Sequence, residues 1–215
     1  MDRVKIIENY IDNLIPNPKC ELNYNKDYEL LIAVMLSAQT TDKRVNIVTN
    51  ELFTKYSSLE KLKTAELNDL KRIIKSLGSY NKKAEYIKNI ATIICDKYNG
   101  IMPRDRENLE NLPGVGRKTV NVVFGELDIE PEIAVDTHVE RVSKRLYLAT
   151  NNDSVYNVEM KLRKKFKKDT WNKRHKQLVL FGRYHCKAIK PDCIKCGLKN
   201  ICRYYKKEGI KWIEH

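Results

Sequence analysis

Long apolar runs are missing from this chain of 215 residues. No stretch reaches the ~18–20 apolar residues that a membrane-spanning helix needs. The first ten residues, MDRVKIIENY, include acidic side chains and hold no apolar core of the kind found in secretory signal peptides. These absences argue against a membrane or exported protein, and we expect the chain to work in the cytosol.

The alternation of apolar and polar residues that is typical of β-strands is also missing, as are internal repeats and low-complexity linkers. Residues 28–38 are nearly all apolar and predict a helix buried on most sides. The sequence therefore predicts an all-α fold. Further helices are expected over residues 4–14, 41–56, 66–78, 81–100, 116–126, 137–147, 154–167 and 171–185, with Gly78 and Gly100 closing two of them.

Acidic residues are few relative to basic ones: 28 Asp and Glu stand against 41 Lys and Arg, a net charge of +13. Such a surplus indicates a polyanionic partner, DNA or RNA, and charge alone fits a ribosome-associated protein as well as a DNA enzyme. Residues 161–176 hold nine of the basic residues. Such a run is commonly a solvated helix face, but this one directly precedes a cysteine cluster and could face phosphates.

Cysteines are unevenly distributed. Four of the six fall within 17 residues with the spacing C-x6-C-x2-C-x5-C, at Cys186, Cys193, Cys196 and Cys202. Four thiolates this close indicate a metal centre, either an iron–sulfur cluster or zinc, and the single C-x2-C pair tilts the choice toward iron–sulfur. Lys187 and Lys190 lie in the loop between the first two cysteines and are candidates for phosphate contacts. Cys20 stands alone, and Cys95 belongs to an apolar helix face.

The segment LPGVGRKTVNVVFGE, residues 112–126, combines a tight turn at Pro113, Gly114 and Gly116 with an apolar helix. Backbone N–H groups at such a helix N-terminus can approach a phosphate, although a plain helix–turn–helix connection has the same pattern. Lys118 falls in the first turn of that helix. The positive end of the helix dipole and the adjacent Arg117 disfavour an ammonium there, and partial burial would act in the same direction. Lys118 is therefore a candidate nucleophile for Schiff-base chemistry.

A second reactive candidate lies in AVDTHVERV, residues 134–142. Thr137 and Glu140 fit a capping box, which predicts a helix that starts after Thr137 and places Asp136 just outside it. An ionised carboxylate in that position can stabilise a developing sugar cation or act as a base.

Taken together, these features resemble the endonuclease III family of the helix-hairpin-helix DNA glycosylases. The resemblance runs from ELNY at residues 21–24 to Cys202 and rests on LLIAVMLSAQTTD, LPGVGRKT, AVDTHV, GRYHC and the cysteine spacing. It implies two helical lobes, residues 21–130 and residues 1–20 with 131–215, in a monomer that binds duplex DNA carrying a damaged base or an abasic site.

The resemblance also implies roles for individual residues. Lys118 would attack C1′ and displace the base, Asp136 would assist, and β-elimination would then cleave the strand. Substrates would be oxidised pyrimidines, flipped out of the helix, with Gln39 filling the space left behind. The four clustered cysteines would hold a [4Fe–4S] cluster. The expected DNA-contacting residues are Gln39, Ser79, Tyr80, Gly114, Gly116, Arg117, Thr137, His138, Lys187 and Lys190.

One position departs from the family pattern. Relatives place a leucine wedge after the glycine of LGSYN, where this chain has Ser79. Tyr80 could take over the wedge by stacking on a base, or it could pack inward.

Two other functions fit part of the sequence. An adenine-mismatch glycosylase would need a glutamate where Ala33 stands and normally lacks the lysine at position 118. A DNA-binding redox sensor without catalysis would leave both Lys118 and Asp136 unexplained.

Overall fold

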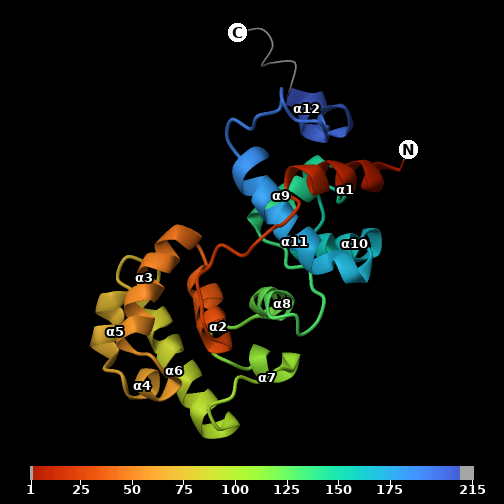
Figure 1. The fold of residues 1–215 in the computed structure, drawn as a ribbon. Helices are drawn as coiled ribbons and strands as arrows, with labels where there is room; N and C mark the ends of the chain where they lie inside the picture. The colour runs from red at the N-terminus through yellow and green to blue at the C-terminus, as the bar shows by residue number, and fades with distance from the viewer. Residues whose placement is uncertain (1, 209–215) are drawn as a thin grey trace. The chain divides into compact units, whose positions relative to one another are not determined.

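A computed structural model describes residues 2–208, and every regular element within that range is helical, which confirms the all-α prediction (Figure 1). The chain divides into two compact units, residues 20–129 and residues 1–19 together with 130–215. None of the helices within residues 2–208 has the length and apolar character needed to cross a bilayer.

The unit of residues 20–129 is built around a buried helix, α2 (Asp27–Leu36), in which every residue from Tyr28 to Leu36 is buried. A helix that is apolar on all sides has to be surrounded, and α2 contacts both α3 (Asp42–Lys55) and α8 (Arg117–Glu126). The long helix α6 (Tyr80–Tyr98) packs against α4 (Leu59–Thr64) and α5 (Leu67–Ile73), and α7 (Arg106–Glu110) packs against α8 (Figure 1).

One predicted helix end in this unit is wrong. Helix α5 ends at Ile73, well before Gly78, and Gly78 does not have a positive φ. The left-handed residue is instead Ser79, which has a φ of 56° and immediately precedes α6. Gly100 does close its helix as expected. Asn99 and Gly100 both have a positive φ, and the N–H of Gly100 donates to the carbonyl of Ile94 at 2.9 Å.

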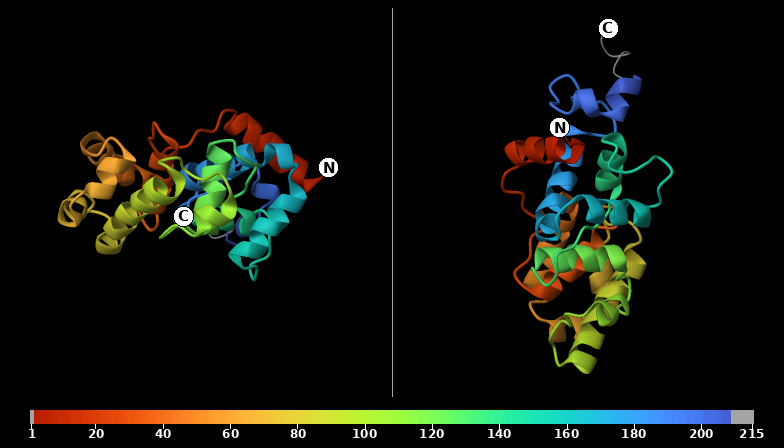
Figure 2. Two further views of the ribbon diagram at one scale, coloured as in Figure 1. Left: turned by 90° about the horizontal axis from the view of Figure 1, so that it is seen from below. Right: turned by 90° about the vertical axis from the view of Figure 1, so that its right-hand side faces the viewer.

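The other unit is centred on α9 (Thr137–Arg145), which contacts α10 (Val155–Lys165), α11 (Trp171–Leu180) and α12 (Arg203–Glu208). Helix α1 (Arg3–Leu14) joins this core through Ile7 and Ile11, as its apolar spacing predicts. Two short 3₁₀ turns, Lys168–Thr170 and Lys199–Ile201, complete the unit, which Figure 2 shows from two further sides.

A π-helical turn, η2 (Phe181–His185), continues α11 and leads directly into Cys186. It packs closely on α9, because a Cβ atom added to Gly182 would lie 2.8 Å from Cβ of His138. The glycine of the GRYHC motif is therefore required by this close approach of the two segments.

Candidate functional site

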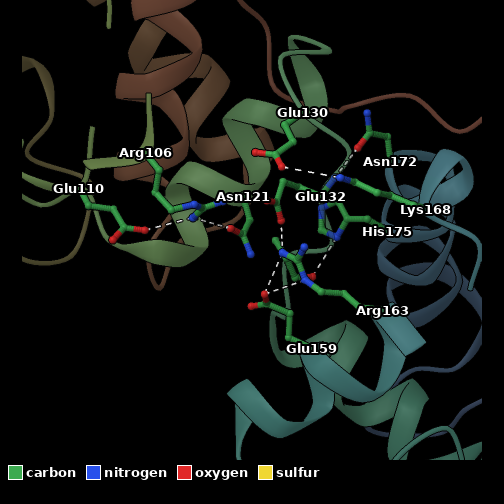
Figure 3. Close-up of polar contacts among 11 residues, drawn as sticks. Arg106, Glu110, Asn121, Glu130, Glu132, Glu159, Arg163, Lys168, Asn172 and His175 are labelled. Carbon is green, nitrogen blue, oxygen red and sulfur yellow. Dashed lines mark hydrogen bonds and ion pairs between the residues drawn. The ribbon is translucent and has the colours of Figure 1, made fainter. Parts of the chain in front are cut away.

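The hairpin between α7 and α8 has a backbone that only glycine suits. Gly114 has φ of +76°, and a Cβ atom there would lie 2.4 Å from Cδ2 of Tyr86 on α6. Arg106 ties the two helices of the motif together by donating to Asn121 Oδ1 at 3.0 Å and to Glu110 Oε1 at 3.1 Å (Figure 3). Tyr86 thus packs against the turn, and the bond from Arg106 to Asn121 joins α7 to α8. The two helices and the turn form a helix-hairpin-helix.

Lys118 is the second residue of α8, in the first turn, as the sequence predicts. The helix begins after Gly116, which has no side chain to cap the N-terminal N–H groups. Gly116, Arg117 and Lys118 are all exposed. Lys118 is therefore accessible to a macromolecular substrate.

Asp136 directly follows residues 131–135, which belong to no helix. Residues of α10 and α11 bind this segment (Figure 3). Glu132 is buried and pairs with Arg163, which also binds Glu159 at 2.9 Å. From α11, Asn172 Oδ1 accepts the N–H of Glu132 at 2.8 Å. His175 Nδ1 lies 2.9 Å from the carbonyl oxygen of Ala134. These contacts fix both the backbone and the direction of the segment that delivers Asp136.

The predicted capping box is wrong by one residue. Asp136 itself is the N-cap of α9, and its Oδ1 accepts the N–H of Val139 at 2.8 Å. Glu140 turns the other way and pairs with Lys144 at 2.6 Å. Aspartate caps a helix at least as well as threonine, which explains the shift. The cap uses one carboxylate oxygen and thereby fixes the direction of the other.

Thr137 and His138 form the first turn of α9. Thr137 is exposed, and its carbonyl oxygen accepts from Arg141 at 3.4 Å. His138 is half-buried, with Nδ1 3.2 Å from Nη2 of Arg141. His138 is thus engaged inside the unit, whereas the Thr137 side chain faces solvent.

Two exposed residues of the other unit, Gln39 and Ser79, stand in the left-handed region with φ of 58° and 56°. Gln39 lies between α2 and α3, and Ser79 begins α6. Arg44 at the start of α3 reaches the second loop, donating to the carbonyl of Ser76 at 3.3 Å. The structure therefore brings the loops of Gln39 and Ser79 together. Tyr80 is half-buried, and its ring packs against the apolar core.

The four clustered cysteines line one cavity of about 280 Å³, together with Tyr10, Phe181 and Tyr204. The pKa of the Cys193 thiol is raised to about 11. Burial is the largest cause, and the neighbouring thiolates of Cys186, Cys202 and Cys196 add to it. The four cysteines therefore line one cavity, where a cationic centre would favour their thiolate forms. Among residues 2–208, the His, Cys, Asp and Glu side chains form no group of three or more with the geometry of a metal site. All six cysteines are free thiols, and Cys20 and Cys95 pack against the core of residues 20–129.

Two arginines near this cavity were not found from the sequence. Arg141 Nε donates to the carbonyl of Cys186 at 3.1 Å, and Arg145 Nη1 lies 3.3 Å from the Cys186 sulfur. Arg145 also donates to the carbonyl of Lys187 at 2.7 Å. The signal was available, since basic residues at i and i+4 of a helix share one face, but a partner far along the chain gives no local pattern.

The basic run of residues 161–176 is largely engaged inside its unit. Lys161 pairs with Asp153 at 2.7 Å, Lys173 with Asp12 at 2.7 Å, and Arg163 and Arg174 with buried or half-buried carboxylates. The expectation that this run faces phosphates therefore applies to fewer residues than its charge implies. Its exposed members include Lys164, Lys165 and Lys167.

Lys187 and Lys190 are both exposed in the loop of the cysteine cavity, where Lys190 has φ of 48°.

Comparison with known proteins is consistent throughout. The family model of the HhH-GPD superfamily of base excision DNA repair proteins matches residues 32–168. Endonuclease III of Bacillus subtilis is 47% identical over 94% of this chain and 92% of its own length. Endonuclease III of Escherichia coli K12 is 43% identical over 91% of this chain and 92% of its own length.

Solved structures give the same result. A non-covalent endonuclease III–DNA complex matches with a TM-score of 0.93 at 45% identity, over 98% of this chain and 99% of that one. A trapped endonuclease III–DNA covalent intermediate matches with a TM-score of 0.92 at 45% identity, over 97% and 99%. A thermostable thymine-DNA glycosylase matches less closely, with a TM-score of 0.83 at 25% identity over 95% and 97%.

Proposed function

Because this chain belongs to the HhH-GPD superfamily of base excision DNA repair proteins and, within it, to the endonuclease III family, we propose that it is a DNA glycosylase and abasic-site lyase that acts on duplex DNA. Lys118 carries the proposal. An exposed amine stands in the first turn of a helix whose preceding hairpin has glycine at positions 114 and 116, where no side chain keeps a phosphate backbone away. Such a lysine can reach the sugar of a flipped nucleotide.

The reaction proceeds through a covalent intermediate. The neutral Lys118 amine attacks C1′, and the bond from C1′ to the base breaks, with the base leaving as it takes up a proton. The nitrogen then loses a proton and the sugar ring opens: the C1′–O4′ bond breaks, O4′ takes up a proton, and the iminium that forms between C1′ and the lysine nitrogen acidifies the protons on C2′. Loss of one of them expels the 3′ phosphate by β-elimination, and water then releases the lysine. Oxidised pyrimidines are the proposed substrates.

Asp136 is positioned for the charged stages of this reaction. Its cap on α9 and the anchored segment before it hold the carboxylate in one orientation. A fixed negative charge stabilises the positive charge that develops on the sugar as the base departs, and a carboxylate can also accept a proton. Ala33, fully buried in α2, counts against an adenine-mismatch glycosylase, since a glutamate is expected there.

The proposed DNA contacts come from several loops. Gln39 and Ser79, or Tyr80, would face the bases around the flipped nucleotide. The hairpin of Gly114 and Gly116, with Arg117, would approach the phosphates next to it. Thr137 and His138 at the start of α9, and Lys187 and Lys190, would complete the interface.

Cys186, Cys193, Cys196 and Cys202 would hold a [4Fe–4S] cluster. The shared cavity and the mutual repulsion of the thiolates support this assignment, and zinc is the alternative. When bound, the cluster would cross-link η2, the loop of Lys187 and Lys190, and the start of α12. Protein purified without air should be brown and absorb near ~400 nm. The colour should be lost in Cys193→Ala and kept in Cys95→Ala, whereas a colourless protein with one zinc would overturn the assignment.

Borohydride trapping tests the function. It reduces the iminium to a stable amine, so wild-type protein incubated with abasic duplex DNA should become covalently attached to it. Lys118→Gln should give no adduct and still bind the duplex. Lys97→Gln, which changes an exposed lysine on α6, is the matched control and should trap as wild type. Undiminished trapping by Lys118→Gln would assign the chemistry to another amine.

A further inference from the structure

The loops of Gln39 and Ser79 share an unfavourable feature. Both residues have a side chain and a positive φ, of 58° and 56°, a conformation that costs about 1 kcal/mol or more outside glycine. A strained backbone persists only where surrounding contacts hold it. Contacts from outside each loop must therefore hold its backbone in this conformation.

Lys83 connects the two loops. It lies one turn into α6, and its N–H donates to the carbonyl of Ser79 at 3.1 Å. Its side chain crosses to the end of α2, where Nζ donates to the carbonyl of Leu36 at 2.9 Å and to that of Ala38 at 2.9 Å. Ala38 immediately precedes Gln39. One residue thus binds the backbone at the base of both strained positions.

The environment of Lys83 is unusual for a lysine. The residue is 5% exposed, and burial lowers the pKa of its ammonium. Within residues 2–208 its recorded side-chain partners are the two carbonyl oxygens and include no carboxylate. An ammonium buried without a carboxylate is costly, and an apolar side chain would fill the same space more favourably. The carbonyl groups at the C-terminal end of a helix are where a cation is best accommodated.

We propose that Lys83 is a positioning residue that holds the Gln39 loop and the Ser79 loop in one arrangement, so that both engage the DNA around a flipped nucleotide at once. Arg44 forms a second tie in the opposite direction, from α3 to the carbonyl of Ser76. The inference rests on the DNA contacts proposed above for Gln39 and Ser79. It adds the requirement that the two loops act as one rigid element.

The first test compares two lysines on α6. Lys83→Met keeps an unbranched side chain, shorter by the terminal amine, and removes its hydrogen bonds to the two carbonyls. It should weaken binding to a duplex with a stable abasic analogue about tenfold, equivalent to about 1.4 kcal/mol of lost preorganisation. Binding to undamaged duplex should stay within about twofold. Lys88→Met is the control, because Lys88 also binds a carbonyl, that of Ala65 at 2.9 Å, but away from these loops. It should bind both duplexes as wild type.

A double-mutant cycle separates positioning from general support of the fold. If Lys83 acts through Gln39, Lys83→Met should weaken binding much less in a Gln39→Ala background than in wild type. Full additivity, wild-type binding by Lys83→Met, or an equal loss on undamaged duplex would each overturn the proposal. Borohydride trapping of the wild-type protein reports on the proposed function separately, so failure of the two ideas can be told apart.

Amide hydrogen exchange on the wild-type protein gives a test that needs no variant. On binding the abasic-analogue duplex, residues 37–41 and 79–83 should gain protection together, and neither should gain it on undamaged duplex. Protection of one segment without the other would contradict the coupling, even if Lys83→Met does not fold.

Discussion

Charge is used differently in the two compact units. In residues 20–129, ion pairs such as Arg104–Asp27 lie at the surface, and the buried Lys83 is bonded to backbone carbonyls. In the other unit, Arg174 is 7% exposed and pairs with Asp12, while Arg163 pairs with the buried Glu132. In the first unit, the loops of Gln39 and Ser79 are held by bonds from Lys83 and Arg44 to backbone carbonyls, which do not titrate in acid. The second depends on ionised carboxylates, and it also carries Asp136 and the cysteines.

The largest effect should come from the carboxylate proposed to act in the reaction. Asp136→Asn should lower the single-turnover rate of base release by about 10²–10⁴, the range for losing one positioned acid–base or electrostatic group. Its melting temperature should barely change, because asparagine caps a helix as well as aspartate.

Asp105→Asn is the matched control in the other unit, since Asp105 caps α7 by accepting the N–H of Asn108 at 2.9 Å. It makes the same substitution at the same kind of position without the proposed chemistry, and should keep the wild-type rate. A wild-type rate for Asp136→Asn, or loss of its fold, would assign Asp136 a structural role only.

The next effect concerns stability. Asp12 binds Arg174 at 2.9 Å, and the variant Asp12→Asn would leave Glu8, 3.3 Å from Arg174 Nε, as the remaining carboxylate partner of that buried guanidinium, at a cost of about 2 kcal/mol. Asp69 in the other unit binds Lys55 at 2.8 Å and accepts from Tyr56 at 2.6 Å, but Lys55 is half exposed and an asparagine oxygen still accepts from Tyr56, so Asp69→Asn should cost under about 1 kcal/mol. Urea unfolding at neutral pH measures both, and equal losses would break the contrast between the units.

The same pair gives a pH dependence. The hydrogen bond from Arg174 holds the pKa of Asp12 well below its usual range, and bonds from Lys55 and Tyr56 lower that of Asp69 to about 2. A lowered pKa stabilises the fold above the ordinary value near ~4, and this stabilisation is lost as pH falls toward the folded-state value. Asp12→Asn should therefore flatten the stability of the protein between about pH 5 and 2 more than Asp69→Asn does. Parallel curves for the two variants would contradict this.

Much of the fold followed from local pattern. The buried run of residues 28–38, the stripe of Ile7 and Ile11, and the position of Lys118 after LPGVG each depend on neighbours along the chain. The helix start at Asp136 was placed one residue late, because Asp136 and Thr137 are both good caps and periodicity does not choose between them.

Contacts between distant segments could not be predicted in the same way. Arg145 meets Cys186 across 41 residues, and Lys83 meets Leu36 across 47. The basic run of residues 161–176 gave a misleading signal for the same reason. Its partner Asp12 lies on α1, far from it in sequence, so a run that looks solvated is partly internal.

A smaller effect should separate the two sources of positive charge. Lys187→Ala with Lys190→Ala should reduce the slope of log affinity against log salt by about two, since each phosphate contact contributes about 0.9. Lys164→Ala with Lys165→Ala, at exposed positions of the basic run, removes the same charge elsewhere. An equal reduction by both pairs would indicate general attraction rather than contact by the cysteine loop.

The smallest effect is expected at Tyr80, which follows Ser79, the position where relatives have a leucine wedge. A wedge has to leave the protein surface and replace lost base stacking, which is worth roughly 1–3 kcal/mol per aromatic ring. The Tyr80 ring is half-buried against the core in the free protein, so inserting it into DNA would give up that packing. Ser79 is exposed at the tip, but it is too short and polar to stack.

We therefore expect Tyr80→Ala to lower the melting temperature and to change binding to an abasic-analogue duplex by less than about threefold. Ser79→Leu should tighten that binding, although its left-handed backbone limits the gain. A loss of about tenfold in Tyr80→Ala, with no gain in Ser79→Leu, would instead identify Tyr80 as the wedge.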